Sequence, residues 1–387
     1  MIDVKSKEDC CGCHACASAC AHRAITMQAD AEGFLYPIVD KDACTDCGLC
    51  EQVCPVVHQY SPTRPLKVYA ARSYDEELRR QSSSGGIFTL LAEAVIREGG
   101  VVFGAKFDKE WNVIHSWADT IEELAPFRGS KYVQSTIGNT YREAKKFLQQ
   151  GRKVLFTGTP CQIAGLKRYL CKDYDNLLAA DVICHGVPSP IVWKRYLDEM
   201  RTMGEITDIS FRDKTNGWAR YGFRLCYSTS EEEEKVFLQP FLQNTYMRGF
   251  LSDLYLRPSC YACPFRTGKS GSDITLGDFW GIGAQHPEMD DNGGTSALIV
   301  NSDKGISWLM KIKANLSPTT LQAVEVKNPA LYVSCKPHRK RSKFFPLKST
   351  DDIDKHIQRL LKPTLWENIN QKWFQIKQQY KLKQRKK

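Results

Sequence analysis

CCGCHACASAC, residues 10–20, and CTDCGLCEQVCP, residues 44–55, decide the fold of the first part of this chain. Each stretch spaces four cysteines as C-x2-C-x2-C-x3-C, and the second run begins 34 residues after the first. Three thiolates at this spacing hold three corners of one 4Fe–4S cube, and the fourth cysteine crosses to the other cube. The spacing predicts a first cluster on Cys10, Cys13, Cys16 and Cys54 and a second cluster on Cys44, Cys47, Cys50 and Cys20.

Two zinc knuckles are the alternative interpretation, because C-x2-C pairs also hold zinc. Zinc sites usually join two such pairs through a longer spacer and need neither the third cysteine nor the duplicated fourth. The two runs differ in one respect, since Cys20 is followed by Ala21 and Cys54 by Pro55. Cys11 lies inside the first run but outside its spacing, so we interpret it as a thiol that binds no metal.

The segment between the two runs predicts a hairpin. Residues 24–40, AITMQADAEGFLYPIVD, alternate apolar and polar side chains around Glu32-Gly33. After the second run, residues 61–65 (SPTRP) have the composition of a linker. We therefore expect a first domain over residues 1–60.

Composition restricts the class of protein. The chain has 387 residues, 42% of them hydrophobic and 25% charged, which suits a globular protein of two or three modules. It shows no run of about 18 uncharged apolar residues and no apolar signal segment at its start, so we expect a cytoplasmic protein without a membrane span. Nine of the 16 cysteines lie within the first 54 residues. Because the cytosol keeps thiols reduced, they are metal ligands or redox groups.

Two polar segments of the second part are candidate anion sites. Residues 81–100, QSSSGGIFTLLAEAVIREGG, predict a helix from residue 87 that follows a turn of small residues. Its free amides and dipole can hold an anion, or Ser84 can simply cap the helix. The loop RGSKYVQS, residues 128–135, is either a clamp for phosphate and ribose or a solvated connection.

The following segments predict a parallel sheet. Residues 101–108 and 113–118 read as two strands joined by a turn, and residues 138–150 as an amphipathic helix. Two buried strands, residues 152–156 and 176–183, each lead into a glycine-containing turn. Such βαβ units gather ligands beyond the carboxyl ends of their strands.

Four further cysteines are placed to share a site. Cys161 and Cys184 follow the two buried strands, so they should lie at the same sheet edge, and Cys260 and Cys263 form a C-x2-C-P motif. Four thiolates are the full set of ligands that a third 4Fe–4S cube needs. Zinc, a nucleophilic Cys161 or a redox dithiol at Cys260 and Cys263 are the alternatives. The cysteines without a predicted ligand role are Cys11, Cys171, Cys226 and Cys335.

With these residues in view, the chain resembles the family of coenzyme F420 (deazaflavin) hydrogenase/dehydrogenase β subunits, to which the plant hydroxymethyl-chlorophyll reductase and the front half of a deazaflavin-dependent sulfite reductase are also similar. The resemblance covers residues 1 to about 335 and rests on SSSGGIFT, RGSKYVQS, GTPCQIAGLK, CHGVPSP, CYACPFR, GDFWG and NGGTSALIV. It implies FAD beside a 4Fe–4S cluster held by Cys161, Cys184, Cys260 and Cys263. The flavin-binding residues that it implies are Ser83, Ser84, Gly85, Gly86, Arg128, Ser130, Lys131 and Gln134.

The fold expected from these segments is α+β. A small ferredoxin-like domain with two 4Fe–4S clusters precedes a mixed α/β flavin and iron–sulfur domain over residues 66–335, in parts 66–150 and 151–335. A basic helical tail over residues 336–387 ends the chain.

The resemblance implies an FAD- and 4Fe–4S-dependent oxidoreductase that moves electrons between a ferredoxin or other redox protein and a deazaflavin or other hydride acceptor. Clusters carry single electrons and a hydride carries two, so a flavin is needed between them. The alternatives are an electron-transfer subunit that catalyses nothing alone and a zinc-dependent binding module. Candidates for acid and base catalysis beside the third cluster are His185, Lys269, Asp273 and Asp278.

The tail carries most of the net charge of +10, because residues 336–387 hold sixteen Lys and Arg against four Asp and Glu. Leu365, Ile369, Trp373, Ile376 and Tyr380 recur at helical spacing. Such an amphipathic helix can pack on the body, dock an acidic redox partner or make peripheral contact with an anionic membrane. Nucleic acid is not expected, because the basic residues are confined to the tail.

Overall fold

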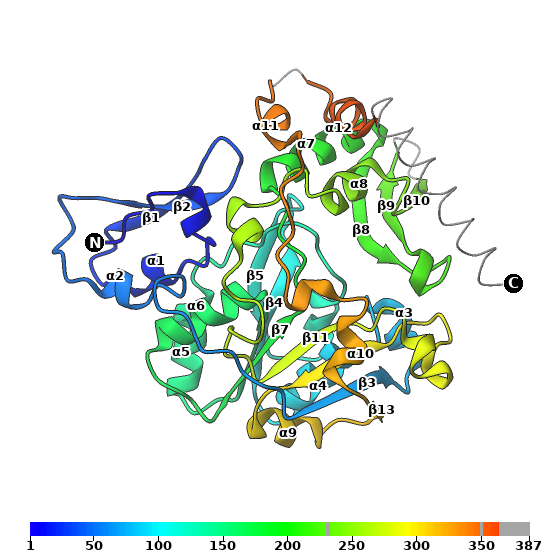
Figure 1. Ribbon diagram of the computed structural model, residues 1–387, viewed down its shortest axis with the longest axis horizontal. Coiled ribbons are helices and arrows are strands. Elements are labelled where there is room, and N and C mark those ends of the chain that lie inside the picture. Colours follow the sequence, from blue (N-terminus) through cyan, green and yellow to red (C-terminus); the bar gives the residue numbers. More distant parts are fainter. Residues whose placement is uncertain (230–232, 349–350, 364–387) are drawn as a thin grey trace, which may run out of the picture.

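The structure is a computed structural model that describes residues 1–229, 233–348 and 351–363. The first 60 residues form a small unit at the left of Figure 1. Its hairpin pairs β1 (Ile25–Ala29) with β2 (Leu35–Val39) in antiparallel register. Asp30 closes the turn, because its carboxylate accepts hydrogen bonds of 3.0 Å from the backbone N–H groups of Glu32 and Phe34. The predicted hairpin is confirmed.

The two cysteine runs fold alike. Each run contains a short helix, α1 (Ala15–Ala19) in the first and α2 (Leu49–Gln52) in the second. Each run has two residues with positive φ, Gly12 and His14 in the first and Asp46 and Gly48 in the second. Left-handed residues next to right-handed ones turn successive backbone N–H groups toward one concave side, which favours a bound anion.

A central sheet of eight strands forms the body, in the order β13-β3-β12-β11-β7-β6-β4-β5. The four middle neighbours β4, β6, β7 and β11 run parallel, and the outer pairs are antiparallel. The strands are β3 (Lys67–Ser73), β4 (Val101–Phe107), β5 (Val113–Ala118), β6 (Val154–Gly158), β7 (Leu177–Val182), β11 (Ile274–Asp278), β12 (Ser296–Val300) and β13 (Ala314–Pro318). The predicted parallel unit is confirmed, although its first buried strand begins two residues later than expected.

Helices cover both faces of this sheet. The remaining helices of the body are α3 (Glu76–Gln81), α4 (Ile87–Arg97), α5 (Thr140–Gln149), α6 (Pro160–Leu170), α9 (Asp303–Leu309) and α10 (Leu321–Glu325). On one face, Leu91 of α4 packs with Leu155 of β6 and Trp308 of α9. On the other face, Ile163 of α6 packs with Phe156 of β6 and with Cys13 and Val53 of the N-terminal unit. The N-terminal unit therefore shares a hydrophobic core with the body.

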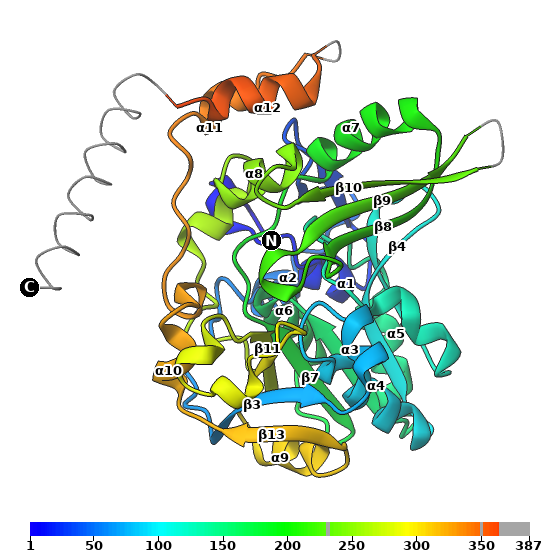
Figure 2. The same ribbon diagram turned by 90° about the vertical axis from the view of Figure 1, so that its right-hand side faces the viewer.

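A second lobe lies above the sheet (Figures 1 and 2). Its elements are the antiparallel strands β8 (Glu205–Asp213), β9 (Gly222–Ser228) and β10 (Glu234–Pro240) and the helices α7 (Pro190–Met200), α8 (Thr245–Leu251), α11 (Arg341–Phe344) and α12 (Ile353–Leu361). Its core is aromatic, with Trp193, Phe211, Phe223 and Tyr246 buried together. Phe344 belongs to the same core, so the first part of the basic segment packs on the second lobe.

The helix predicted around Trp373 lies outside the described residues, as do its neighbours at 365, 369, 376 and 380. None of the helices in the described ranges is both long and apolar enough to cross a membrane.

Candidate functional site

The second predicted cluster site is a small hollow at the end of the N-terminal unit. It is lined by Cys20, Cys44, Cys47 and Cys50. Cys20 belongs to the first run and the other three to the second, which is the arrangement that ligand crossing requires. The backbone N–H of Ile2 donates a 3.2 Å hydrogen bond to Cys50 Sγ. Cys47 is exposed, so this site faces solvent.

The first predicted site lies deeper. Burial raises the pKa of Cys16 to about 12, and the nearby Cys10, Cys54 and Cys50 thiols add to the effect. Cys54, the last cysteine of the second run, lies near Cys10 of the first. Buried neutral thiols must lose their protons to bind iron, so cluster binding here releases protons.

The predicted third site is also a common hollow. Cys161, Cys184, Cys260 and Cys263 all line a cavity of about 70 Å³. Cys161 is in the first turn of α6 after β6, Cys184 lies two residues after β7, and Cys260 lies on a 3-10 turn, Pro258–Ala262. The carboxyl ends of two neighbouring parallel strands thus bring the cysteines together. Among the described residues no three His, Cys, Asp or Glu side chains converge as ligands of a single metal ion.

Cys11 and Cys335 also belong to this neighbourhood, which the sequence spacing did not reveal. Cys11 is buried, lines the same cavity as the four cysteines, and its thiol is next to those of Cys13 and Cys161. The thiol of Cys335 donates to the carbonyl oxygen of Cys260 at 3.5 Å. That Cys11 binds no metal stays a prediction, but its thiol is not remote from the third site, because the N-terminal unit docks this part of the first run against α6.

A second cavity, of about 640 Å³, opens directly beside the third site. The two cavities share Asp181, Val182, Ile183, Cys184, Gly186, Val187 and Ala330. Pockets for cofactors commonly have volumes of about 300–1,000 Å³. A cofactor in the large cavity would therefore lie against the cysteine site.

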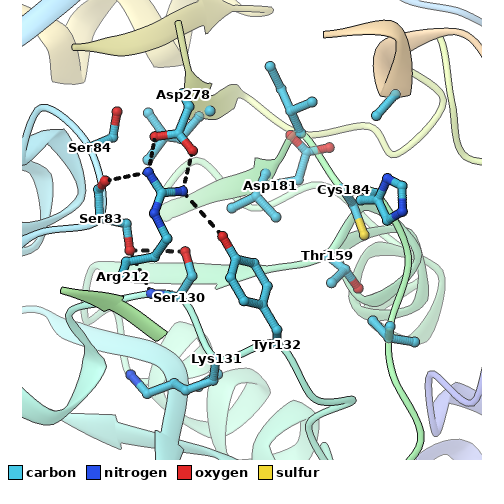
Figure 3. Close-up of a pocket in the computed structure, with 18 of the residues that line it drawn as sticks. Ser83, Ser84, Ser130, Lys131, Tyr132, Thr159, Asp181, Cys184, Arg212 and Asp278 are labelled. Atoms are coloured by element: carbon cyan, nitrogen blue, oxygen red, sulfur yellow. Dashed lines mark hydrogen bonds and ion pairs between the residues drawn. The ribbon is translucent and has the colours of Figure 1, made fainter. Parts of the chain in front are cut away.

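Six of the eight flavin-binding residues that the resemblance implies line this large cavity. They are Ser83, Ser84, Gly86, Arg128, Ser130 and Lys131. The two predicted anion segments are joined to each other, because the backbone N–H of Ser130 donates to Ser83 Oγ at 2.7 Å, and Figure 3 shows the two serines side by side. Gly86 begins α4 in the left-handed conformation and no side chain caps the helix, so Ser84 is not a cap. The first turn of α4 thus has no side-chain cap, and its backbone N–H groups can bind an anion.

Unpartnered polar atoms indicate a polar ligand in this cavity. Ser84 Oγ, Arg128 Nε, Arg212 Nε and Asp181 Oδ1 are buried without a hydrogen-bond partner, and all four residues line the cavity. Native proteins leave few such atoms unsatisfied. The cations Arg128 and Lys131 suit a pyrophosphate, so the residues present fit FAD.

Two predicted flavin residues do not line the large cavity. Gly85 packs against the sheet, where its N–H donates to Ser296 Oγ at 2.9 Å and its carbonyl accepts from the N–H of Ser73. Gln134 instead faces the N-terminal unit, because its Nε2 donates to the carbonyl oxygen of Cys11 at 3.0 Å. Both positions serve packing between segments.

Sequence reasoning missed Arg212, which lies in the wall of the cavity between Asp278 and Tyr132 (Figure 3). Its guanidinium donates to Asp278 Oδ2 at 2.6 Å, to the Tyr132 hydroxyl at 3.2 Å and to the carbonyl oxygen of Ser83 at 3.1 Å. It also lies over the ring of Tyr221. Burial opposes its charge, yet Asp278 holds the pKa of Arg212 above its ordinary value. A single arginine in β8 has no local pattern that would have revealed this role.

The four acid–base candidates divide between the cavity and the scaffold. His185 and Asp278 line the large cavity. His185 Nε2 lies 2.6 Å from Asp253 Oδ1, and Asp278 is paired with Arg212. Lys269 and Asp273 line neither cavity, and Asp273 accepts hydrogen bonds from the Ala179 N–H and the Ser302 hydroxyl. The structure thus places two of the four at the site.

Asp181 is a further carboxyl at the site. It is near the end of β7 and lines both cavities, with 4% of its surface exposed. Burial raises its pKa to about 6, although the hydroxyls of Ser270, Thr275 and Ser272 oppose the shift. A neutral carboxyl can therefore persist here at mildly acidic pH.

Family models match three parts of the chain. Residues 9–57 match a 4Fe-4S dicluster domain. Residues 68–140 match the N-terminal part and residues 151–325 the C-terminal part of the coenzyme F420 hydrogenase/dehydrogenase beta subunit. These last two matches together cover more than half of the chain.

Individual relatives are more distant. The chain is 25% identical to one of the subunits of the F(420)H(2) dehydrogenase of Methanosarcina mazei over 175 residues, which are 42% of this chain and 49% of the relative. The match therefore spans about half the length of that relative. A solved structure of the F420-reducing NiFe hydrogenase complex from Methanosarcina barkeri has a chain that aligns with a TM-score of 0.47 and 18% identity. That alignment covers 70% of this chain and 88% of the other.

Proposed function

Since the chain belongs to the family of coenzyme F420 hydrogenase/dehydrogenase beta subunits, we propose that it exchanges electrons between 4Fe–4S clusters and a hydride carrier through bound FAD. The observation that carries the proposal is the shared wall of the two cavities. Cys184 and the segment from Asp181 line both the cysteine hollow and the larger cavity beside it. Electron transfer between two cofactors needs such closeness.

The residues of the large cavity divide the work of holding FAD. Arg128, Lys131 and the first turn of α4 suit the pyrophosphate, and Arg212 fixes the wall formed by Tyr132 and Asp278. FAD would supply the exchange between two-electron hydride chemistry and one-electron transfer.

The N-terminal unit supports a fixed electron path. Its first cysteine run packs on α6 next to the third site, and its second hollow faces solvent at the far side. We propose that electrons pass from an external redox protein through the second and first clusters to the third, or in reverse. A hydride acceptor such as a deazaflavin would then meet the flavin in the large cavity.

Anaerobic purification followed by quantification of iron, acid-labile sulfide and flavin tests this proposal. Three cubes predict about twelve iron and twelve sulfide per chain, with one FAD. Reduced deazaflavin should then bleach both flavin and cluster absorbance in the isolated chain. Absence of FAD from protein that carries its clusters would contradict the proposal.

The second candidate is an electron-transfer subunit without catalysis of its own. The similarity to the Methanosarcina mazei protein favours it, since that relative is one subunit of a dehydrogenase. This function predicts clusters that exchange electrons with a partner protein but no reduction of the isolated chain by a hydride donor.

A further inference from the structure

Three arginines are buried in the part of the chain that the structure describes, and one of them differs from the other two. Arg79 and Arg212 form ion pairs with Asp291 and Asp278. Arg257 has no exposed surface, and no carboxylate of residues 1–229, 233–348 or 351–363 pairs with it. A buried charge is costly unless an opposite charge compensates it, so Arg257 requires an explanation.

The partners of Arg257 are neutral and belong largely to the N-terminal unit. Nε donates to the carbonyl oxygen of Cys10 at 2.8 Å and Nη2 to that of Leu35 at 2.9 Å. Nη1 donates to Oε1 of Gln134 at 3.0 Å. The guanidinium lies over the ring of Tyr36, with 4.4 Å to its centroid. These contacts orient the cation but do not neutralise it.

Two predicted clusters flank this cation. On one side, the backbone of the first cysteine run is so close that a Cβ on Gly12 would lie 2.7 Å from Arg257 Nη1. On the other side, Arg257 lines the hollow of Cys161, Cys184, Cys260 and Cys263. The charge is thus placed between the first and third sites and away from the hollow of the second.

We propose that Arg257 is the shared buried counter-charge of the first and third clusters and that it raises the reduction potential of both. A cube held by four thiolates is anionic, and the charge becomes more negative on reduction, so a nearby cation favours the reduced form. This inference rests on the proposed function insofar as it needs the third cluster. The inference adds one residue, Arg257, whose charge sets the reduction potentials of two clusters on the proposed electron path.

The test is a redox titration of the holoprotein, monitored by the paramagnetic spectra of the reduced clusters. Arg257→Gln should lower the midpoint potentials of the first and third clusters, because the cation is lost, and leave the second cluster unchanged. Arg257→Lys should restore most of both potentials, since it keeps the charge but loses the fork of hydrogen bonds. Arg142→Gln is the matched control, because Arg142 also donates to carbonyl oxygens of the N-terminal unit, those of Ser18 and Ala17.

A second variant leaves the arginine in place. Gln134→Glu puts a carboxylate of the same shape where Oε1 now accepts from Arg257, so it should lower the same two potentials, at the loss of the one hydrogen bond that Nε2 donates to the Cys11 carbonyl oxygen. This variant keeps the inference testable if Arg257→Gln does not fold. Unchanged potentials in Gln134→Glu, or equal shifts in Arg142→Gln, would overturn the inference and leave Arg257 a packing residue.

Failure of this inference can be distinguished from failure of the proposed function. Iron near eight per chain in the wild type, with no third paramagnetic signal, would reject the third cluster. The first cluster would still report on Arg257 in the same titration.

Discussion

Ser84 and Gly85 are adjacent in the sequence but face different surroundings, the large cavity and the central sheet. The Ser84 hydroxyl is buried in the large cavity without a partner, whereas Gly85 fits against the backbone of β3 and β12. A Cβ at position 85 would collide with the carbonyl oxygen of Ala71 and lie 2.9 Å from the Ser296 nitrogen. An acidic or even a methyl side chain at Gly85 therefore acts first on the fold.

Replacing each of these two residues by alanine distinguishes the role in packing from the role in FAD binding. Gly85→Ala should lower the free energy of unfolding by about 1–3 kcal/mol, seen as a lower melting temperature, because the sheet must shift to admit the methyl group. Ser84→Ala should keep the melting temperature of the flavin-free protein and retain less FAD. An equal melting temperature for Gly85→Ala and the wild type would contradict the packing role.

Asp181 makes stability depend on pH. Its pKa of about 6 lies above the 3.8 of an exposed aspartate, so the folded state binds the extra proton between about pH 4 and pH 6. The free energy of unfolding should fall as the pH rises through this window, by roughly 3 kcal/mol for two pKa units. Asp181→Asn should remove this fall and be the more stable protein at pH 7, which melting curves from pH 4.5 to 7.5 would measure.

A second buried carboxyl, which accepts a hydrogen bond from a backbone N–H, provides the comparison for Asp181. Asp273 accepts from the Ala179 N–H and the Ser302 hydroxyl, so Asp273→Asn should destabilise the protein at pH 7. If Asp181→Asn behaved in the same way, its carboxylate would have to be ionised and paired in the folded state.

At the scale of elements, the third cysteine site depends on where strands end. Cys263→Ser should lower the iron content by about four per chain, because the cube loses a ligand from the turn after α8. Cys171→Ser is the control, since Cys171 is exposed at the end of α6. Iron that stays constant in Cys263→Ser would show that this turn holds no cluster.

The two cysteine runs of the N-terminal unit give a second prediction at this scale. Cys54 belongs to the second run but lies near Cys10, so Cys54→Ser should perturb the paramagnetic spectrum of the first cluster and spare the second. Cys20→Ser should do the opposite, because Cys20 lines the hollow of the second run. The reverse pattern would mean that each run holds its own cube.

Local patterns predicted these elements well and predicted single residues poorly. The hairpin, the parallel strands β6 and β7, and the helices after glycine turns each follow from a repeated pattern along the chain. Arg212, Arg257 and Asp181 are single residues whose roles arise from segments far apart in sequence. The family resemblance implies that Gln134 and Gly85 bind the flavin, but neither lines the large cavity, because adjacent residues of one loop face different neighbours.

At the scale of the molecule, the N-terminal unit is fixed to the body rather than tethered. Arg341 and Glu32 form a partly buried ion pair across the interface, and the Ser189 hydroxyl donates to the carbonyl oxygen of Glu32. Gly165 of α6 leaves room for the first cysteine run, since a Cβ there would lie 2.8 Å from Cys13 Cβ. Electron transfer between the two parts thus needs no domain motion.

Gly165→Val tests this close contact. The larger side chain should push the first cysteine run away from α6, so amide hydrogen exchange in residues 10–20 should become faster and electron transfer from the first to the third cluster slower. Iron content should remain near that of the wild type, because no ligand is removed. Unchanged exchange in that segment would show that the contact with α6 does not hold the unit in place.

The position of Cys11 in the wall of the third hollow has a consequence for biogenesis. Four of the thiols around that hollow come from the body, but the fifth arrives only when the N-terminal unit docks. The proposed third cluster would therefore have the part of its wall formed by Cys11 only after the N-terminal unit has docked. The order of cluster insertion and docking thus decides whether the proposed third cube enters a hollow of four thiols or of five.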